Sequence, residues 1–257
     1  MADLRLQLRR RVLAHEKSGP IEWRIQREPR TVSAARSAML LCDVWDRHWC
    51  RGAEQRLDRL LPRIDEVTRA ARAAGMLVVH APSETMPFYA ETPARRRALE
   101  APPVALPELQ PHDDPPLPID DSDGGCDTRG DRFHTPWTRQ HPAIGIDQER
   151  DVISDNGDEI YNVYRQYGIA TVFITGVHVN MCVLRRSFAI KALVQRGIDV
   201  VLVRDLTDAM YNPASQPYVS HDEGTRLVVA YIEAFWCPTV ASDELLAAVR
   251  LATGGAG

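Results

Sequence analysis

The stretch ITGVHVNMCV, residues 174–183, places a cysteine where a buried strand gives way to a helix. Apolar residues lead to a glycine and a polar bend, and Cys182 follows at the expected helix start. The unpaired N–H groups and the dipole of a helix start favour an anion, so this position is expected to lower the pKa of the thiol. Asn180 is a good capping type just ahead of it. Cys182 is therefore a candidate nucleophile, and a small buried cysteine is the alternative.

A second candidate ends an earlier apolar run. Asp43 follows SAMLLC, whose continuous apolar character is typical of a strand buried on both faces of a parallel sheet. Ligands bind beyond the carboxyl ends of such strands. A cysteine nucleophile needs a proton acceptor and later a proton donor for its leaving group, and a carboxyl group can serve as both. Asp43 is therefore a candidate general acid/base, and a helix cap or loop ligand is the alternative.

The elements that must position these residues alternate along the chain. Alternating strands and helices of this length predict a three-layer α/β/α fold with a mostly parallel, Rossmann-like sheet. Pro62 interrupts one helical pattern, which indicates a kink or a break there. The expected strands are 37–44, 76–82, 170–177 and 198–205, and the expected helices are 53–74, 94–101, 158–168, 180–197, 222–236 and 242–252.

Two segments depart from this alternation. Residues 1–36 are polar and arginine-rich, and we expect an N-terminal arm with a short helix near Leu4–Leu13 and an irregular stretch that Trp23 pins to the body. Residues 102–136 are rich in proline and aspartate and predict a long ordered loop or lid. Residues 37–257, which include this loop or lid, are interpreted as one domain, although the length of the chain would also permit two.

Composition narrows the class of protein. Hydrophobic residues make up 44% and charged residues 26%, and the net charge of -4 argues against a nucleic-acid-binding domain. No apolar run reaches the ~20 residues of a membrane helix, and the N-terminus lacks the apolar core of a signal peptide. The five cysteines are odd in number and widely spread, which suggests neither a disulfide framework nor a zinc ribbon. These features predict a cytoplasmic protein in a reducing compartment.

The two candidate sites together resemble a known family. MLLCDVWD near Asp43 and TGVHVNMCVL near Cys182 are similar to motifs of the isochorismatase-like cysteine hydrolase superfamily, over roughly residues 37–210. The resemblance implies an α/β/α fold, a homo-oligomer such as a dimer or tetramer, and cofactor-free hydrolysis of amides and related C–N bonds. It implies Cys182 as nucleophile and Asp43 as general acid/base. It also implies a cis peptide between Val177 and His178, with an oxyanion hole formed by the N–H groups of Cys182 and this bend.

One family feature is missing. That family uses a lysine between the two motifs, whereas the only lysines here are Lys17 and Lys191, and neither lies in that interval. Arg139, in WTRQHPAI, occupies roughly the position of that lysine. It can supply a positive charge but cannot readily give up a proton. His141 is the competing candidate because histidine can donate and accept protons near neutral pH.

Several further residues bear on substrate and metal. Trp45 and Trp137, with Trp49, Phe88 and Tyr89, could form an aromatic wall, and core or subunit contacts are the alternative. His178 and Tyr211 are further candidates for substrate contact. HAPSETM does not support the metal site of the nicotinamidase branch, while Asp46, His48 and His80 could form an unrelated one.

These observations predict a cysteine-dependent hydrolase of a small amide, carbamoyl or related C–N substrate, with no cofactor or metal and with neither nucleic acid nor membrane as partner. Two other functions remain open. A catalytically degenerate relative would bind a ligand without turnover. A metal-assisted hydrolase would use His48, His80 or His141.

Overall fold

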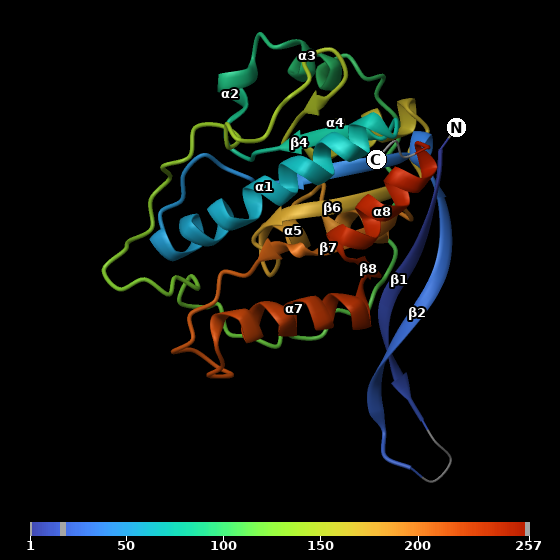
Figure 1. Ribbon diagram of the computed structural model, residues 1–257. Coiled ribbons are helices and arrows are strands. Elements are labelled where there is room, and N and C mark those ends of the chain that lie inside the picture. Colours follow the sequence, from blue (N-terminus) through green and yellow to red (C-terminus); the bar gives the residue numbers. More distant parts are fainter. Residues whose placement is uncertain (1, 16–18, 255–257) are drawn as a thin grey trace.

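The computed structural model describes residues 2–15 and 19–254, and a twisted sheet forms its centre (Figure 1). Within these residues the sheet has eight strands in the order β2-β1-β8-β7-β6-β3-β4-β5. From β8 to β5 all neighbouring strands are parallel, and β1 is antiparallel to both β2 and β8. The strands are β1 (Asp3–Ala14), β2 (Glu22–Ser33), β3 (Ser37–Cys42), β4 (Leu77–Ala81), β5 (Val152–Ile153), β6 (Thr171–Val177), β7 (Asp199–Asp208) and β8 (Thr239–Val240).

Helices cover both faces of the sheet. Side chains of β3 alternate between two apolar clusters, because Met39 and Leu41 join one and Leu40 and Cys42 join the other. The first cluster packs under α1 and α8, and the second packs under α4, α5, α6 and α7. The predicted three-layer α/β/α fold is therefore confirmed. The α-helices are α1 (Arg51–Ala73), α2 (Met86–Tyr89), α3 (Pro93–Leu99), α4 (Gly157–Gln166), α5 (Cys182–Arg185), α6 (Ile190–Gln195), α7 (His221–Phe235) and α8 (Ser242–Ala252).

Pro62 does not divide the first predicted helix, but a later predicted helix is divided. Helix α1 runs through Pro62 as one element. The single helix predicted over 180–197 is wrong, because α5 ends after one turn and α6 begins only at Ile190. The backbone of Arg186 is extended, with ψ 152°, and Ala189 is extended too. None of the described helices is both long and apolar enough to cross a bilayer.

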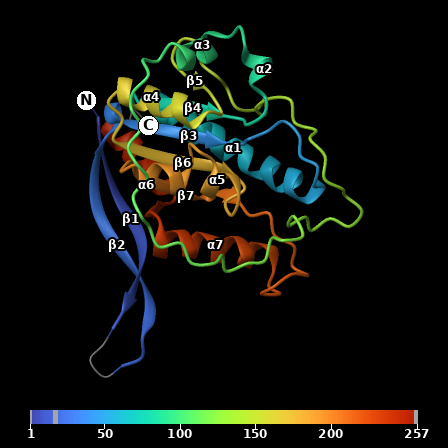
Figure 2. The ribbon, with the colours of Figure 1, turned by 180° about the vertical axis from the view of Figure 1, so that it is seen from behind.

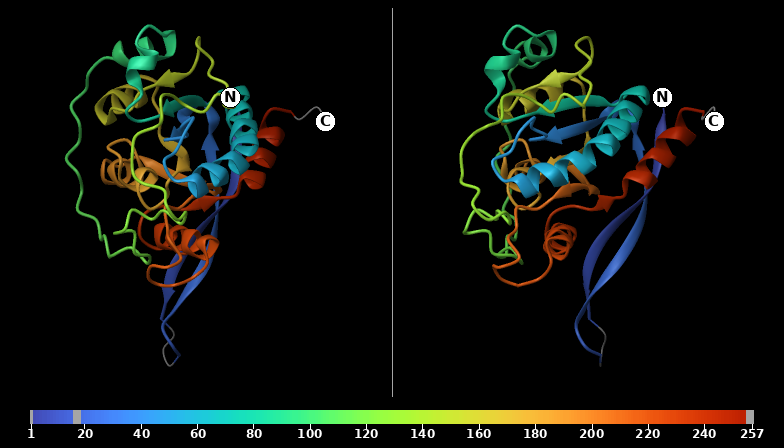
Figure 3. Two further views of the ribbon diagram at one scale, coloured as in Figure 1. Left: turned by 90° about the vertical axis from the view of Figure 1, so that its left-hand side faces the viewer. Right: turned by 60° about the vertical axis from the view of Figure 1, so that its left-hand side comes forward.

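The helix predicted near Leu4–Leu13 is also wrong. These residues form β1, which pairs with β2 along its whole length to make a long antiparallel hairpin (Figures 2 and 3). Leu4, Leu6 and Leu8 are spaced by two and are all buried, which is the period of a strand and not of a helix. We call the two strands of this hairpin, residues 3–14 and 22–33, together with the described residues 15 and 19–21, the arm. Lys17 lies outside the described residues.

A disulfide corrects the interpretation of the cysteines. Cys50 and Cys126 are bonded across 76 residues of sequence, with their Cα atoms 5.7 Å apart. Cys50 precedes α1, and the proline-rich segment (residues 102–136) folds back to bring Cys126 beside it. Spacing along the chain gave no sign of this pairing. The prediction of a reducing compartment rested on the absence of a disulfide, and that premise no longer holds.

Candidate active site

The ends of two neighbouring strands bring the candidate residues together. Cys42, the last residue of β3, pairs with Gly176 of β6. Gly176 has φ 116°, and a Cβ there would lie 1.9 Å from the carbonyl oxygen of Cys42, so this approach requires glycine. Asp43 follows β3 directly, and Cys182 follows β6 after a short bend.

The carboxylate of Asp43 is buried and surrounded by donors. The backbone N–H of Ser83 donates to its Oδ1 at 2.7 Å, and Arg186 Nε donates to its Oδ2 at 3.1 Å. The thiol of Cys182 lies near the same carboxylate, and the two groups shift each other's pKa. Asp43 itself has φ 51°, a left-handed conformation that aspartate tolerates better than most residues. Asp43, Cys182 and Arg186 therefore form one contiguous site.

Burial dominates the electrostatics of this site. It raises the pKa of Asp43, although Arg186 and the hydrogen bonds from Cys182 and Ser83 act in the opposite direction. Burial and the adjacent Asp43 carboxylate also raise the pKa of the Cys182 thiol, which the charge of Arg186 only partly offsets. The expected lowering of this pKa by a helix start is therefore not found, since α5 has one turn and the thiol lies in a low-dielectric setting.

Arg186 is the cation of this site and was missed by the sequence reasoning. Its guanidinium stays protonated. Besides Asp43 it has a second acidic partner, Glu84, whose Oε1 lies 3.9 Å from Arg186 Nη2. Arg186 follows Cys182 by four residues, about one helical turn, and this spacing could have marked it as a neighbour of the nucleophile. It does not lie between the two motifs, where similar proteins have their lysine.

Arg139 and His141 occupy a different place. Arg139 Nε lies 3.9 Å from Asp46 Oδ2, its side chain is 43% exposed, and its guanidinium covers the ring of Phe88. His141 Nε2 lies 3.8 Å from Asp58 Oδ1. Both line a cleft of about 320 Å³, and neither is among the described contacts of Asp43 or Cys182.

The bend before Cys182 carries the expected backbone feature. The peptide between Val177 and His178 is cis, at the position that the resemblance implies. The backbone N–H of His178 donates toward the sulfur of Cys182, which favours the thiolate. The His178 side chain is buried, its pKa is lowered to about 3 by burial, and its Nε2 has no hydrogen-bond partner. Its imidazole is therefore neutral at physiological pH.

An aromatic stack adjoins the site. The rings of Trp45 and Trp137 stack with centroids 4.4 Å apart and planes 13° apart, and His48 stacks on both. Trp45 Nε1 donates to the carbonyl oxygen of Ser83, whose N–H binds Asp43. Ser83 thus ties this stack to the carboxylate. The sequence reasoning did not single out Ser83.

Of the other aromatic candidates, Trp49 continues this stack through His48, with ring centroids 5.6 Å apart. Trp49 meets Phe133 edge to face, and Phe88 meets Tyr89 in the same way.

Tyr211 and Asn180 have structural contacts in this conformation. Tyr211 is fully buried, and its hydroxyl donates to the carbonyl oxygen of Ser215. Asn180 does not cap a helix, since Met181 holds the N-cap position of α5. Instead its side-chain amide donates to the Met210 carbonyl at 3.0 Å and accepts from the Met210 N–H at 2.9 Å. Asn180 therefore joins the loop before Cys182 to the end of β7.

The histidines considered for a metal site, His48, His80 and His141, each contact different groups. His80 donates from Nε2 to Asp151 and accepts at Nδ1 from Gln140, so both ring nitrogens are occupied. The one group with metal-ligand spacing in the described part of the chain comprises Cys50, Cys126 and Asp131. Two of its three members are joined in the disulfide.

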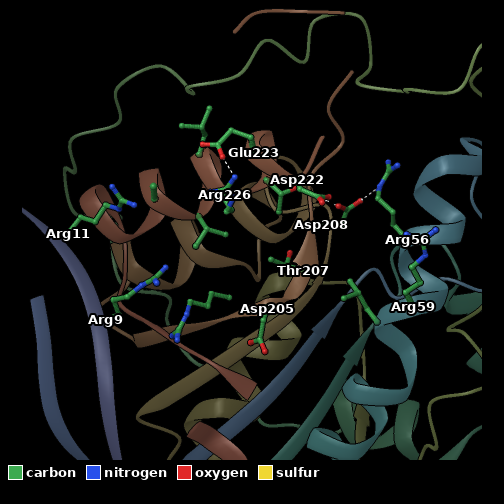
Figure 4. A pocket seen from close by; sticks show the side chains of 16 residues that line it. Arg9, Arg11, Arg56, Arg59, Asp205, Thr207, Asp208, Asp222, Glu223 and Arg226 are labelled. Atoms are coloured by element: carbon green, nitrogen blue, oxygen red, sulfur yellow. Dashed lines mark hydrogen bonds and ion pairs between the residues drawn. The ribbon is translucent and has the colours of Figure 1, made fainter. Parts of the chain in front are cut away.

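A larger cleft lies between the arm, α1, β7 and α7, and none of Asp43, Cys182 and Arg186 is among its described lining residues. Its volume is about 760 Å³, and Figure 4 shows Arg9 and Arg11 of β1 on the side opposite Arg56 and Arg59 of α1. Asp208, at the end of β7, accepts from Arg56 Nε at 2.9 Å, and Arg9 and Arg11 both lie against Glu233. Six arginines and four carboxylates line this cleft, so its lining carries an excess of positive charge.

Comparisons with known proteins identify the architecture. No family model matches the sequence, and no curated protein matches it. Among solved structures, the chain is similar to a cysteine hydrolase from Pseudomonas syringae pv. phaseolicola 1448A, with 19% identity, TM-score 0.56, and coverage of 86% of this chain and 95% of that one. It is also similar to a protein described as an isochorismatase from Burkholderia xenovorans LB400, with 21% identity, TM-score 0.51, and coverage of 86% and 89%. The chain therefore has the isochorismatase-like fold.

Proposed function

We propose that this protein is a cysteine-dependent hydrolase that cleaves a small amide, carbamoyl or related C–N substrate at Cys182. The observation that carries the proposal is the cluster at the ends of β3 and β6, in which Arg186 donates to buried Asp43 and the Cys182 thiol lies near the same carboxylate. A carboxylate held between a thiol and a guanidinium is positioned to accept the proton of the thiol and later to donate it to a leaving group.

In the proposed reaction, Asp43 accepts the thiol proton as the sulfur of Cys182 attacks the carbonyl carbon. Transfer during attack suits a thiol whose pKa is raised, because the free thiolate need not accumulate. Backbone N–H groups of Cys182 and the His178 bend are proposed to hold the oxyanion. The protonated Asp43 then gives its proton to the leaving nitrogen, the C–N bond breaks, and a thioester remains.

Water completes the cycle. Asp43, again a carboxylate, takes a proton from a water molecule as the water oxygen attacks the thioester carbon. The C–S bond then breaks, Asp43 returns that proton to the sulfur, and the acid product leaves with Cys182 restored as a thiol. Arg186 remains charged throughout and stabilises the carboxylate form of Asp43, which is the role we propose in place of the lysine named for similar proteins. Arg139 and His141 are proposed at most to contact substrate from their separate cleft, and Trp45, Trp137, His178 and Tyr211 remain proposed substrate-side residues.

The test is a panel of small primary amides, ureas and carbamates, followed by release of ammonia or amine. Wild type should turn over at least one compound and form a Cys182 acyl adduct visible by mass spectrometry. Cys182→Ala and Asp43→Asn should abolish turnover. Arg139→Gln should retain it, because Arg139 does not contact Asp43. Ligand binding without any turnover or adduct would favour the degenerate binding protein, and activity lost to chelators would favour a metal-assisted hydrolase.

A cytoplasmic location and a homo-oligomeric state also remain proposals.

A further inference from the structure

The two bonded cysteines belong to a group with the spacing of metal ligands. The sulfurs of Cys50 and Cys126 and a carboxylate oxygen of Asp131 all lie within 4.8 Å of one another. Ligand atoms bound to one tetrahedral Zn²⁺ at ~2.0–2.3 Å lie about 3.3–3.8 Å apart. The three atoms are therefore close to the spacing that one shared ion requires.

The chemistry of this group suits zinc. Thiolate sulfur favours soft or borderline ions such as Zn²⁺, whereas Mg²⁺ and Ca²⁺ take oxygen ligands. Asp127 adjoins the same place, because its Oδ1 lies 3.7 Å from Cys50 Sγ. Two sulfurs and one carboxylate thus fill three positions of a four-coordinate ion, and Asp127 or water is at hand for the remaining one.

Neighbouring donors fix the orientation of Asp131. The backbone N–H of Arg51 donates to its Oδ2 at 2.8 Å, and Arg51 Nε donates to its Oδ1 at 2.9 Å. Such hydrogen bonds orient a carboxylate ligand, and each oxygen keeps a further lone pair for an ion. The charge of Arg51 also offsets the negative charge that remains when two thiolates and one carboxylate surround Zn²⁺.

The loop that carries Cys126 is held against α1 by more than the disulfide. The backbone N–H of Gly52 donates to Thr128 Oγ1 at 3.0 Å, and Arg56 Nη1 donates to Asp127 Oδ2 at 2.6 Å. These contacts do not involve sulfur, so they persist when the disulfide is reduced. The ligand atoms therefore stay near one another in the reduced protein.

The position of Cys50 favours the form of sulfur that a metal binds. Cys50 is the N-cap residue of α1, a helix of 23 residues. Unpaired N–H groups and the helix dipole at such a position stabilise a thiolate. Reduction of the disulfide therefore leaves a thiol that is ready to lose its proton to an incoming ion.

We propose that Cys50, Cys126 and Asp131 bind Zn²⁺ when the disulfide is reduced, so that disulfide and metal are alternative links between α1 and the proline-rich segment. A dithiol reductant supplies two electrons and two protons. The S–S bond breaks, two thiols form, and the reductant becomes its own disulfide. Zn²⁺ then displaces both thiol protons into the solvent. This proposal does not depend on the chemistry proposed for Cys182, because it uses none of that site's residues.

The test uses Co²⁺ as a visible substitute for Zn²⁺. The full chain is reduced with dithiothreitol, freed of reductant by gel filtration without oxygen, and titrated with Co²⁺. One equivalent should give the absorption bands of tetrahedral cobalt and a near-ultraviolet sulfur-to-cobalt charge-transfer band, and Zn²⁺ should remove both. The untreated, disulfide-bonded protein should show neither.

Four variants assign the ligands. Cys126→Ser should lose the charge-transfer band, and Asp131→Asn should bind Zn²⁺ at least tenfold more weakly. Asp113→Asn is the matched control, because Asp113 is exposed in the same proline-rich segment, and it should bind like wild type. Cys182→Ala should also bind like wild type, since the candidate nucleophile is not a ligand. Circular dichroism should show that all four are folded.

Limited proteolysis shows whether the metal replaces the disulfide as a link. Residues 120–131 should be cut fastest in the reduced, metal-free protein. Addition of Zn²⁺ to that protein should slow the cleavage toward the rate of the disulfide-bonded form. In Asp131→Asn the same addition should protect much less at equal zinc concentration.

A reduced wild type without the charge-transfer band would overturn the proposal. Unchanged zinc affinity of Asp131→Asn would overturn it too, as would loss of binding in Cys182→Ala, which would place the metal at the candidate active site. The disulfide-bonded protein cannot form this zinc site. Amide turnover by that form, with and without chelators, therefore tests the proposed hydrolase separately.

Discussion

Arg186 Nε lies 3.1 Å from Asp43 Oδ2, and this pair joins the chain just beyond the candidate nucleophile to the end of a strand 143 residues earlier. Asp43 is fully buried, whereas the Arg186 side chain is about one third exposed. A buried carboxylate stays charged only where a partner compensates for its lost hydration. The charge of Arg186 therefore lowers the pKa of Asp43 and of Cys182, against the larger effect of burial.

Replacing Arg186 should shift both pKa values upward. Removing a positive charge disfavours the charged form of an acid, so Arg186→Met should raise the pKa of Asp43 and of the Cys182 thiol. A base works only when deprotonated, and the acidic limb of the pH–rate profile should therefore move to higher pH. Arg186→Lys is the control and should keep the limb near that of wild type. Identical profiles for all three proteins would contradict the assigned role.

Replacing Asp43 should separate thiol reactivity from turnover. The Asp43 carboxylate raises the pKa of Cys182, so Asp43→Asn should lower that pKa and let iodoacetamide label the thiol at lower pH. Turnover should nevertheless be lost, because no base remains. Labelling is read by peptide mass spectrometry without reductant, with the buried Cys42 and Cys237 as internal references. Slower labelling at every pH would show that Asp43 does not act on the thiol as described.

Gly176→Ala should destabilise the fold strongly. The new Cβ would overlap the Cys42 carbonyl at 1.9 Å, and φ 116° is strained for alanine. We expect a loss of about 3 kcal/mol or more in the free energy of unfolding by urea titration. Gly145 has open space around its Cα and no positive φ, so Gly145→Ala should change stability by no more than about 0.5 kcal/mol. Equal effects of the two variants would argue against the close strand approach.

Loss of the Cys50–Cys126 disulfide should loosen the proline-rich segment. The bond closes a span of 76 residues, and Cys126→Ser should lower the free energy of unfolding by about 2–5 kcal/mol. Cys50 and Cys126 pack in one small apolar cluster with Met181, the residue before Cys182. Limited proteolysis should therefore cut residues 120–131 faster in the variant. Cys237→Ser, at a free buried cysteine, is the control and should leave this cleavage rate unchanged.

The sequence by itself determined the architecture and two members of the site. Continuous apolar runs such as SAMLLC indicate strands buried on both faces, and polar residues at their ends lie at one edge of the sheet. Asp43 and Cys182 were found in this way because the position and burial of a strand are indicated locally, by residue types and their spacing. The cis bond before His178 was reached through resemblance of the motif and not through spacing.

Only the tertiary structure decided which groups act on those residues. Arg186 meets Asp43 because the chain leaves the helix at that residue, and no pattern in the sequence marks the break. The raised pKa of Cys182 depends on the low dielectric around the thiol and on a carboxylate far away in sequence, so local helix-start reasoning gave the wrong sign. The disulfide and the pairing of the arm were also decided by the tertiary structure. Both depend on which distant segments meet, and that is set by the packing of the whole chain and not by the neighbours of any one residue.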